Sequence, residues 1–185
     1  MPLGDSGCAK RMKRLWLDGC DIVEEDMRAL ADLICRDTLP ALEELSVHGN
    51  SDITDAGDVA LAEALLKLTQ TSLKILTLSN VGMGDEGIAA LASLAYRGRK
   101  DQLRVLNFAE NDGVADEGIS ALARAVEAHM LPMLEDIYPS GGLPPEVHRL
   151  LLCILVIQKR LIVREKAPNS TLPLPLHFFV QSKSH

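Results

Sequence analysis

Aromatic residues are scarce in this chain, at 3% of 185 positions, so a hydrophobic core has to be built mainly from aliphatic side chains. Hydrophobic residues as a class reach 47%. A chain of this length and composition buries a substantial core without help from a metal ion or a disulfide. We therefore expect one folded domain.

Markers of metal, redox and nucleotide chemistry are also missing. The four cysteines have no metal-ligand spacing and form no CxxC pair; they are Cys8, Cys20, Cys35 and Cys153. No GxxxxGK[ST] phosphate loop, GxGxxG fingerprint or HExxH motif occurs, and the acidic clusters lack the calcium-loop pattern. The sequence therefore predicts no cofactor and no metal site, and it argues against an enzyme.

Long apolar runs are absent as well. The longest, residues 150–157, ends at Gln158 after eight residues, whereas a membrane-spanning helix requires about 20. The N-terminus lacks the apolar core of a secretory signal, and cysteines without a pairing pattern are typical of reducing compartments. We predict a cytoplasmic chain without a membrane partner. The nucleus is the alternative location, because the basic runs at 10–14 and 97–100 resemble import signals.

Basic residues are few in most of the chain. Residues 1–142 hold 13 basic and 24 acidic side chains, and only residues 143–185 have a basic excess, of 6 over 2. Nucleic-acid binding requires clustered lysine and arginine. The main body is therefore predicted to bind not nucleic acid but another protein, with a basic surface as its electrostatic complement.

What the sequence does contain is an internal repeat. An apolar triplet at relative positions 0, 3 and 5 recurs with a period of 30, 31 and 30 residues, starting at Met12, Leu42, Leu73 and Leu103. A fainter fifth copy follows at Leu134 and Ile137. A second landmark keeps the same period and is occupied by Asp26, Gly57, Gly87 and Gly118. Two landmarks with one period indicate a true repeat.

Each repeat has the pattern of a strand followed by a helix. In residues 73–80 apolar and other side chains alternate, which predicts a strand buried on one face. In residues 84–95 apolar side chains follow at helical spacing, and Asp85 and Glu86 favour a helix start. The glycine landmark falls at the loop-to-helix junction, where a missing Cβ permits an unusual backbone angle or close packing. Neighbouring strands are expected to pair in parallel.

The pattern LxxLxLxx(N/C), with a helical second half, resembles leucine-rich repeats of the ribonuclease-inhibitor type. The resemblance spans residues 12–142 and is clearest in LKILTLSNVGMGDEGIAALASL and LRVLNFAENDGVADEGISALARAV. It implies an α/β solenoid, a short horseshoe with parallel strands on the concave face and helices on the convex face. Solenoids of this family recognise many unrelated proteins. The position after each strand holds Cys20, Asn50, Val81 and Asn111; because Val81 departs from the pattern, we expect its loop to be less tightly fastened.

Four segments follow from this arrangement. Residues 1–11 form an N-terminal segment, and residues 12–142 hold four clear repeats and a partial fifth. Residues 143–166 are predicted to be a capping helix that covers the end of the core, and residues 167–185 a flexible tail. The alternatives are a helix at 146–166 that docks on a membrane surface or a partner, and a chain that is a fragment of a longer horseshoe.

The binding residues are predicted from strand geometry, because alternate side chains of each strand point to the solvent face of the sheet. Trp16 is the main candidate anchor, since exposed tryptophan is enriched in binding hot spots. The predicted partner-binding residues are Arg14, Trp16, Asp18, Glu44, Ser46, His48, Thr77, Ser79, Asn107, Asp136 and Tyr138. We predict a protein-interaction module; a regulator of a partner enzyme and a membrane-peripheral adaptor are the alternatives.

One row of this surface has the residue types of a nucleophilic triad, namely Asp18, His48 and Ser79. Side chains that stand parallel on an open sheet have no evident oxyanion hole, substrate pocket or strained nucleophile turn. We therefore interpret the three residues as a solvated polar row rather than as catalytic residues.

Overall fold

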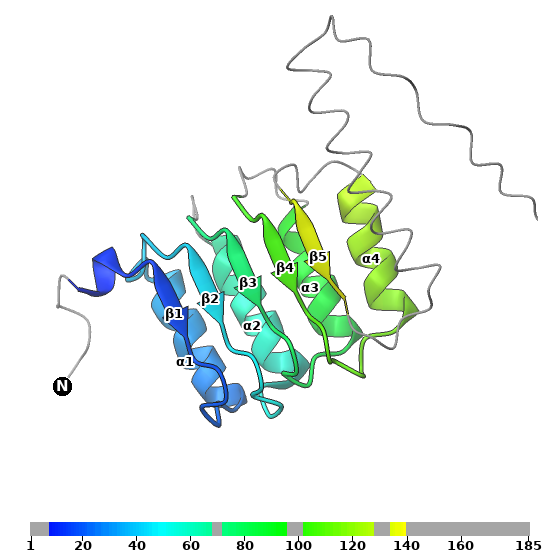
Figure 1. Cartoon of the computed structure of the whole chain (residues 1–185), viewed down its shortest axis with the longest axis horizontal. Coiled ribbons are helices and arrows are strands. Elements are labelled where there is room, and N and C mark those ends of the chain that lie inside the picture. The colour runs from blue at the N-terminus through cyan, green and yellow to red at the C-terminus, as the bar shows by residue number, and fades with distance from the viewer. Residues whose placement is uncertain (1–7, 68–71, 96–101, 128–133, 140–185) are drawn as a thin grey trace, which may run out of the picture.

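The computed structural model describes residues 8–67, 72–95, 102–127 and 134–139, which form a five-stranded parallel sheet backed by a layer of helices (Figure 1). The strands β1 to β5 lie side by side in chain order and span Arg14–Trp16, Glu44–Ser46, Ile75–Thr77, Val105–Asn107 and Asp136–Tyr138. The helices α1 to α4 span Glu24–Cys35, Thr54–Lys67, Asp85–Ala95 and Asp116–Glu127, and a 3-10 turn, η2, spans Ala9–Arg11. The predicted α/β solenoid is confirmed.

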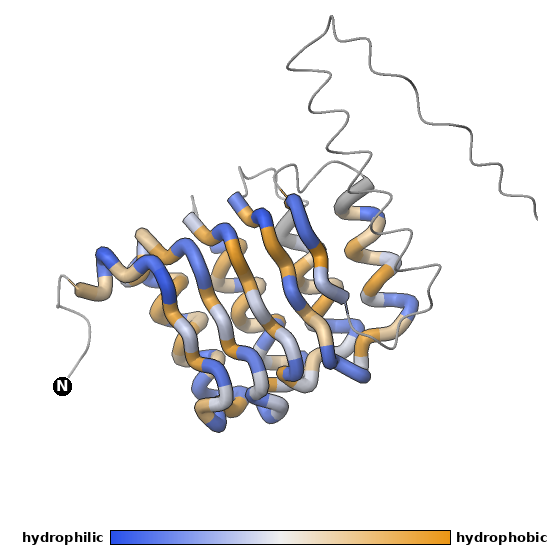
Figure 2. Tube along the Cα trace, in the orientation of Figure 1, coloured by the Kyte–Doolittle hydropathy of each residue, from blue (hydrophilic) through white to orange (hydrophobic). Residues whose placement is uncertain are grey.

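The core lies between the sheet and the helices. The central residue of every strand is apolar, and the parallel register stacks these residues in one row made of Leu15, Leu45, Leu76, Leu106 and Ile137. From β2 onwards the row is buried, with Leu45 fully covered, whereas Leu15 at the sheet edge is only half-buried. Figure 2 shows apolar stretches in β3 and β4 and in the helices behind the sheet. Burial of this aliphatic row is the main stabilising contribution to the sheet, because the free energy gained rises with the apolar area removed from water.

The glycine landmark marks close packing of neighbouring repeats. A Cβ built at Gly57 would lie 2.7 Å from Ile53 Cγ2 and 3.2 Å from Met27 Cβ, and one at Gly118 would lie 2.7 Å from Asp85 Oδ1. None of the landmark glycines has a positive φ, so the need is for space and not for an unusual backbone angle. In the first repeat the position is held by Asp26, which is exposed.

The starts of α3 and α4 are each fastened by an aspartate of the preceding repeat. Asp55 Oδ1 accepts hydrogen bonds from the amides of Gly84 and Gly87, at 2.6 and 2.8 Å. One repeat later Asp85 Oδ1 accepts from the amides of Ala115 and Gly118, at 2.8 and 3.0 Å. A carboxylate in this place satisfies amides at the start of a helix that have no partner within the helix, and it also suits the positive end of the helix dipole.

Two asparagines fasten the loops that follow the strands, and each of them serves two loops. Asn111 Oδ1 accepts from the amides of Val81 and Met83, at 2.9 and 3.1 Å, while its Nδ2 donates to the carbonyls of Leu78 and Phe108. Our expectation that the Val81 loop is less tightly fastened was therefore wrong. The reason is that the asparagine of the next repeat reaches back across the ladder and binds that loop.

Asn50 repeats this arrangement one pair of strands earlier. Its Oδ1 accepts from the amides of Cys20 and Ile22, both at 3.0 Å, and its Nδ2 donates to the carbonyls of Leu17 and Val47. One asparagine in every second repeat is thus enough to satisfy the main-chain groups of consecutive loops.

The predicted capping helix at 143–166 and the tail at 167–185 lie outside the described residues. The same holds for the helix at 146–166 of the membrane-adaptor alternative. Within the residues that are described, no helix is long and apolar enough to cross a membrane.

Candidate protein-binding face

We call the side of the sheet that faces away from the helices the open face (Figure 1). The residues on either side of each central strand residue lie on this face, because side chains alternate along a strand, and they include most of the predicted binding residues. Parallel pairing lines up the strand residues of this face in two rows across the sheet. The first row is Arg14, Glu44, Ile75, Val105 and Asp136, and the second is Trp16, Ser46, Thr77, Asn107 and Tyr138. The short, regular strands therefore bring together side chains that are more than 120 positions apart in the sequence.

Two large apolar side chains close the second row at either end. Trp16 is 60% exposed and Tyr138 is 53% exposed. In the part of the chain that the structure describes, Val23 and Leu33 are the remaining exposed large hydrophobic residues, and both lie away from the strands. The two aromatic side chains of the open face therefore share one row, with the whole width of the sheet between them.

Trp16 is held in a defined orientation by its neighbours. Its indole Nε1 donates to Glu44 Oε1 at 2.9 Å, across the β1–β2 pair. The guanidinium carbon of Arg14 lies 5.6 Å from the centroid of its ring, within the range of a cation–π contact. A large side chain that is already oriented loses less conformational entropy when a partner covers it.

The middle of the open face is less exposed and less polar than its ends. Ile75, Thr77, Val105 and Asn107 are half-buried. Ser46 and Ser79, two of the predicted binding residues, are buried, with exposures of 7% and 4%. Both side chains are short, and the Ser46 hydroxyl donates to Asp18 Oδ1 at 2.5 Å, so the two serines offer little surface to a partner.

A third row, formed by Asp18, His48 and Ser79 just after β1, β2 and β3, does not have the geometry of a catalytic triad. The carboxylate of Asp18 accepts from the main-chain amide of His48 at 3.0 Å instead of from its imidazole. The ring atom Nδ1 of His48 lies 3.1 Å from the carbonyl oxygen of Ser79, not from its hydroxyl. The carboxylate, the imidazole and the hydroxyl are therefore not connected in series, which a triad requires.

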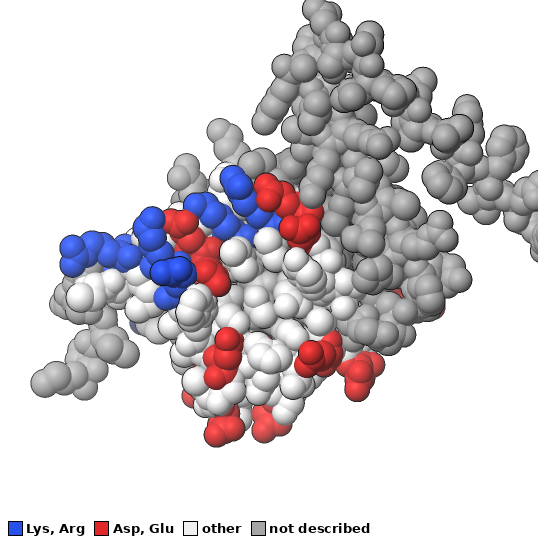
Figure 3. Space-filling model, in the orientation of Figure 1, with Lys and Arg blue, Asp and Glu red and all other residues white. Residues whose placement is uncertain are grey.

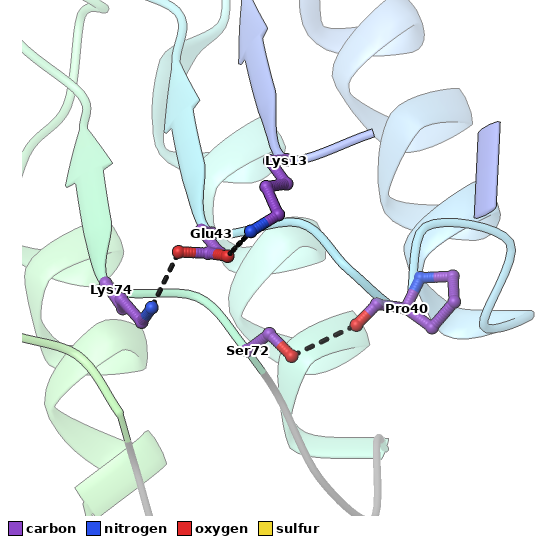
Figure 4. Close-up of polar contacts among 5 residues, drawn as sticks. All are labelled: Lys13, Pro40, Glu43, Ser72 and Lys74. Atoms are coloured by element: carbon purple, nitrogen blue, oxygen red, sulfur yellow. Dashed lines mark hydrogen bonds and ion pairs between the residues drawn. The ribbon is translucent and has the colours of Figure 1, made fainter. Parts of the chain in front are cut away.

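Charged side chains line the amino ends of the strands (Figure 4). Glu43 forms ion pairs with Lys13 and Lys74, at 2.8 and 2.6 Å, and Arg104 lies 3.4 Å from Glu135. Hydrogen bonds from Lys13 and Lys74 lower the pKa of Glu43 to about 2. Next to this row, Ser72 Oγ donates to the carbonyl of Pro40 at 3.1 Å. The positive and negative charges at this end of the face largely neutralise one another.

Among the residues that the structure describes, those at the carboxyl ends of the strands carry acidic charge alone. Figure 3 shows red side chains without blue ones along this edge of the open face. The loops contribute five exposed carboxylates, which we call the acidic rim: Asp18, Asp21, Asp52, Glu110 and Asp112. Among the described residues none of the five forms an ion pair, and no group of three or more potential ligands is arranged to hold a metal ion. The rim therefore offers unpaired negative charge to a partner.

One unusual residue, Asp58, was missed by the reasoning from sequence. Its side chain is fully buried, and in the described residues neither carboxylate oxygen has a hydrogen-bond partner. Burial, with a smaller contribution from the nearby Asp55 carboxylate, raises the pKa of Asp58 to about 8. The repeat contains a signal for this residue, because its equivalents are the buried apolar side chains Met27, Ile88 and Ile119. It lies in the helix layer and not on the open face.

Comparisons with known proteins agree with this architecture. A family described as "Leucine Rich repeat" matches residues 69–92 and 103–123. The tropomodulin C-terminal domain from Caenorhabditis elegans is similar in structure, with a TM-score of 0.65 and 17% identity over 85% of this chain and 90% of that one. The actin-binding site 2 structure of leiomodin-1 is similar with a TM-score of 0.66 and 15% identity, over the same shares of the two chains. No curated protein matches the chain. At these identities the structural likeness shows the fold alone, a parallel sheet backed by helices.

Proposed function

We propose that this leucine-rich-repeat chain is a protein-interaction module that binds a partner protein through the open face, the concave face predicted from the repeat. The observation that carries the proposal is the pair of exposed aromatic side chains, Trp16 and Tyr138, at the two ends of one row. Buried aromatic anchors dominate the binding energy of many protein interfaces. We infer no cofactor, metal ion or catalytic residue for this function.

The chemistry of the face supports a partner with a basic surface. Among the described residues no side chain of the acidic rim forms an ion pair, and the described body of the chain has an acidic excess. Complementary charge speeds association and fixes the orientation of a partner more than it raises affinity. We therefore assign anchoring to Trp16 and Tyr138, and selectivity to Glu44, Asp136 and the acidic rim.

The comparisons support a binding role without identifying the partner. The leiomodin-1 structure is titled an actin-binding site, and its fold is similar to that of this chain. At 15% identity the surfaces of the two proteins are not comparable residue by residue, so we do not propose actin as the partner. The period of 30 to 31 residues and the helical second half favour repeats of the ribonuclease-inhibitor type.

Proximity labelling in cells, with the intact chain and a Trp16→Ala, Glu44→Lys variant, tests the proposal. The variant removes the aromatic anchor and also the acceptor of its indole hydrogen bond. A Leu33→Ala variant is the matched control, because Leu33 is an exposed large hydrophobic residue of α1, away from the open face. Cooperative thermal unfolding of all three chains must first be established.

We expect partners that are labelled by the intact chain and by Leu33→Ala but not by the double variant. Binding through the open face is refuted if the same partners are recovered with all three chains.

A further inference from the structure

Resting on the proposed function, we propose that the occupant of the open face is one α-helix of the partner. The helix lies antiparallel to the strands, its apolar stripe packs between Trp16 and Tyr138, and its N-terminal end carries lysine or arginine against the acidic rim. This inference names the kind of partner element and its direction, which binding through the open face does not by itself require.

The width of the face fits a single helix. Trp16 on β1 and Tyr138 on β5 are separated by four strand spacings, which is about 19 Å at the usual 4.8 Å per spacing. An α-helix with its side chains is about 10 to 12 Å across, so one helix fits on the face between the two aromatic side chains.

The chemistry of the sheet favours a helix over an extended peptide. The main-chain groups of β2, β3 and β4 are used by the neighbouring strands on both sides, so the open face offers side chains and no backbone partners. An extended peptide placed flat on this face would leave its own N–H and C=O groups without partners, whereas a helix satisfies its own. Apolar positions at i, i+3, i+4 and i+7 of the helix would pack on Ile75 and Val105, which are half-buried.

The distribution of charge sets the direction of the helix. The acidic rim at the carboxyl ends of the strands is unpaired, while Glu43 and Glu135 at the amino ends are already paired with lysine or arginine. A helix carries partial positive charge at its N-terminus and partial negative charge at its C-terminus. Both this dipole and a basic first turn are complementary to the face only when the helix N-terminus lies at the acidic rim, which makes the helix antiparallel to the strands.

A library of helix-constrained peptides, displayed on phage and selected on the full chain, tests the inference. Clones that also bind a Trp16→Ala, Tyr138→Ala variant are removed and analysed separately. The most enriched peptide is then synthesised in both its selected and its reversed sequence order. Trp16 is the single tryptophan of the chain and is exposed on the face, so its fluorescence reports occupancy directly.

The role of the rim is tested with an Asp52→Lys, Asp112→Lys variant. Both residues are exposed and neither has a positive φ, unlike Asp21 and Glu110, so the substitutions add no backbone strain. The control is Glu63→Lys, which reverses one acidic charge on exposed surface of α2 and so makes half of this charge change. We expect the rim variant to raise the Kd of the peptide at least about tenfold and the control to leave it within about twofold of the wild-type value. Added salt should reduce the difference between the two variants, because it screens exposed charges.

Three other results would overturn the inference, and they can be told apart. Selected peptides that need Trp16 and Tyr138 but are acidic or extended, or bind equally in reversed order, contradict the basic helix and leave the proposed function standing. Selected peptides that ignore both aromatic residues contradict the open face itself, and with it the proposed function. A library that yields no binders contradicts the helical occupant, and the proximity labelling then decides on the proposed function alone.

Discussion

The buried carboxyl of Asp58 makes the stability of this protein depend on pH in a direction that can be worked out. Its pKa is about 8 in the folded chain and 3.8 when unperturbed, so folding at neutral pH requires the uptake of one proton. The contribution of the protonated Asp58 carboxyl to the free energy of unfolding is complete below pH 4 and is lost as the pH rises to 8. At pH 7 the loss is roughly 4 kcal/mol, because each pH unit between the two pKa values changes the free energy of unfolding by about 1.4 kcal/mol.

An Asp58→Asn substitution removes this titration and keeps the shape of the side chain. We expect the wild-type chain to lose about 3 kcal/mol of unfolding free energy between pH 5 and pH 7 relative to the variant, which corresponds to a fall in Tm of roughly 6 to 12 °C for a chain of this size. Thermal and urea unfolding, followed by circular dichroism at pH 5, 6, 7 and 8, measure the difference. The lowered pKa of Glu43 changes the free energy of unfolding only below pH 4.5, so it does not affect measurements between pH 5 and pH 8.

The control for this experiment is Asp52→Asn, which changes an exposed aspartate near the start of the same helix. Its stability should follow that of the wild type at every pH. Parallel curves for the wild type and Asp58→Asn would refute the reasoning, since they would mean that Asp58 ionises with an ordinary pKa in the folded protein.

Three further predictions concern the contacts between repeats. Asn111→Ala should lower the unfolding free energy by about 2 to 4 kcal/mol, since it leaves buried loop amides and carbonyls unpaired. Urea unfolding measures the loss, and an effect smaller than that of an exposed Asn-to-Ala change would contradict the prediction. Gly118→Ala should cost about 1 to 3 kcal/mol, because the new Cβ would lie 2.7 Å from Asp85 Oδ1, and a neutral result in the same assay would show that the repeats separate easily. Glu43→Gln should abolish the part of acid destabilisation that develops as the pH falls from 4.5 towards 2, because this is the range in which a carboxylate of lowered pKa loses its charge. Unfolding curves at pH 2 to 5 that match those of the wild type would contradict the pairing with Lys13 and Lys74.

The repeat pattern alone determined the architecture and the composition of the open face. Apolar residues at a fixed spacing, such as Leu45 and Leu76, can be buried together only if each repeat adds one strand to a common sheet. The same spacing assigns Trp16 and Tyr138 to one solvent-facing row, because side chains alternate along a strand and equivalent positions lie side by side in a parallel ladder. These conclusions need no knowledge of side-chain contacts, which is why a period read from the sequence was sufficient.

Only the tertiary structure decided how individual polar groups are used. Asn111 binds the loop of the preceding repeat as well as its own, and Ser46 and Ser79 are buried on a face where Trp16 and Tyr138 are exposed. Asp58 is buried without a partner where other repeats carry isoleucine or methionine. The physical reason is that hydrogen bonds and desolvation depend on distances of a few tenths of an ångström between side chains of different repeats. A repeat pattern specifies which positions are adjacent and does not specify those distances.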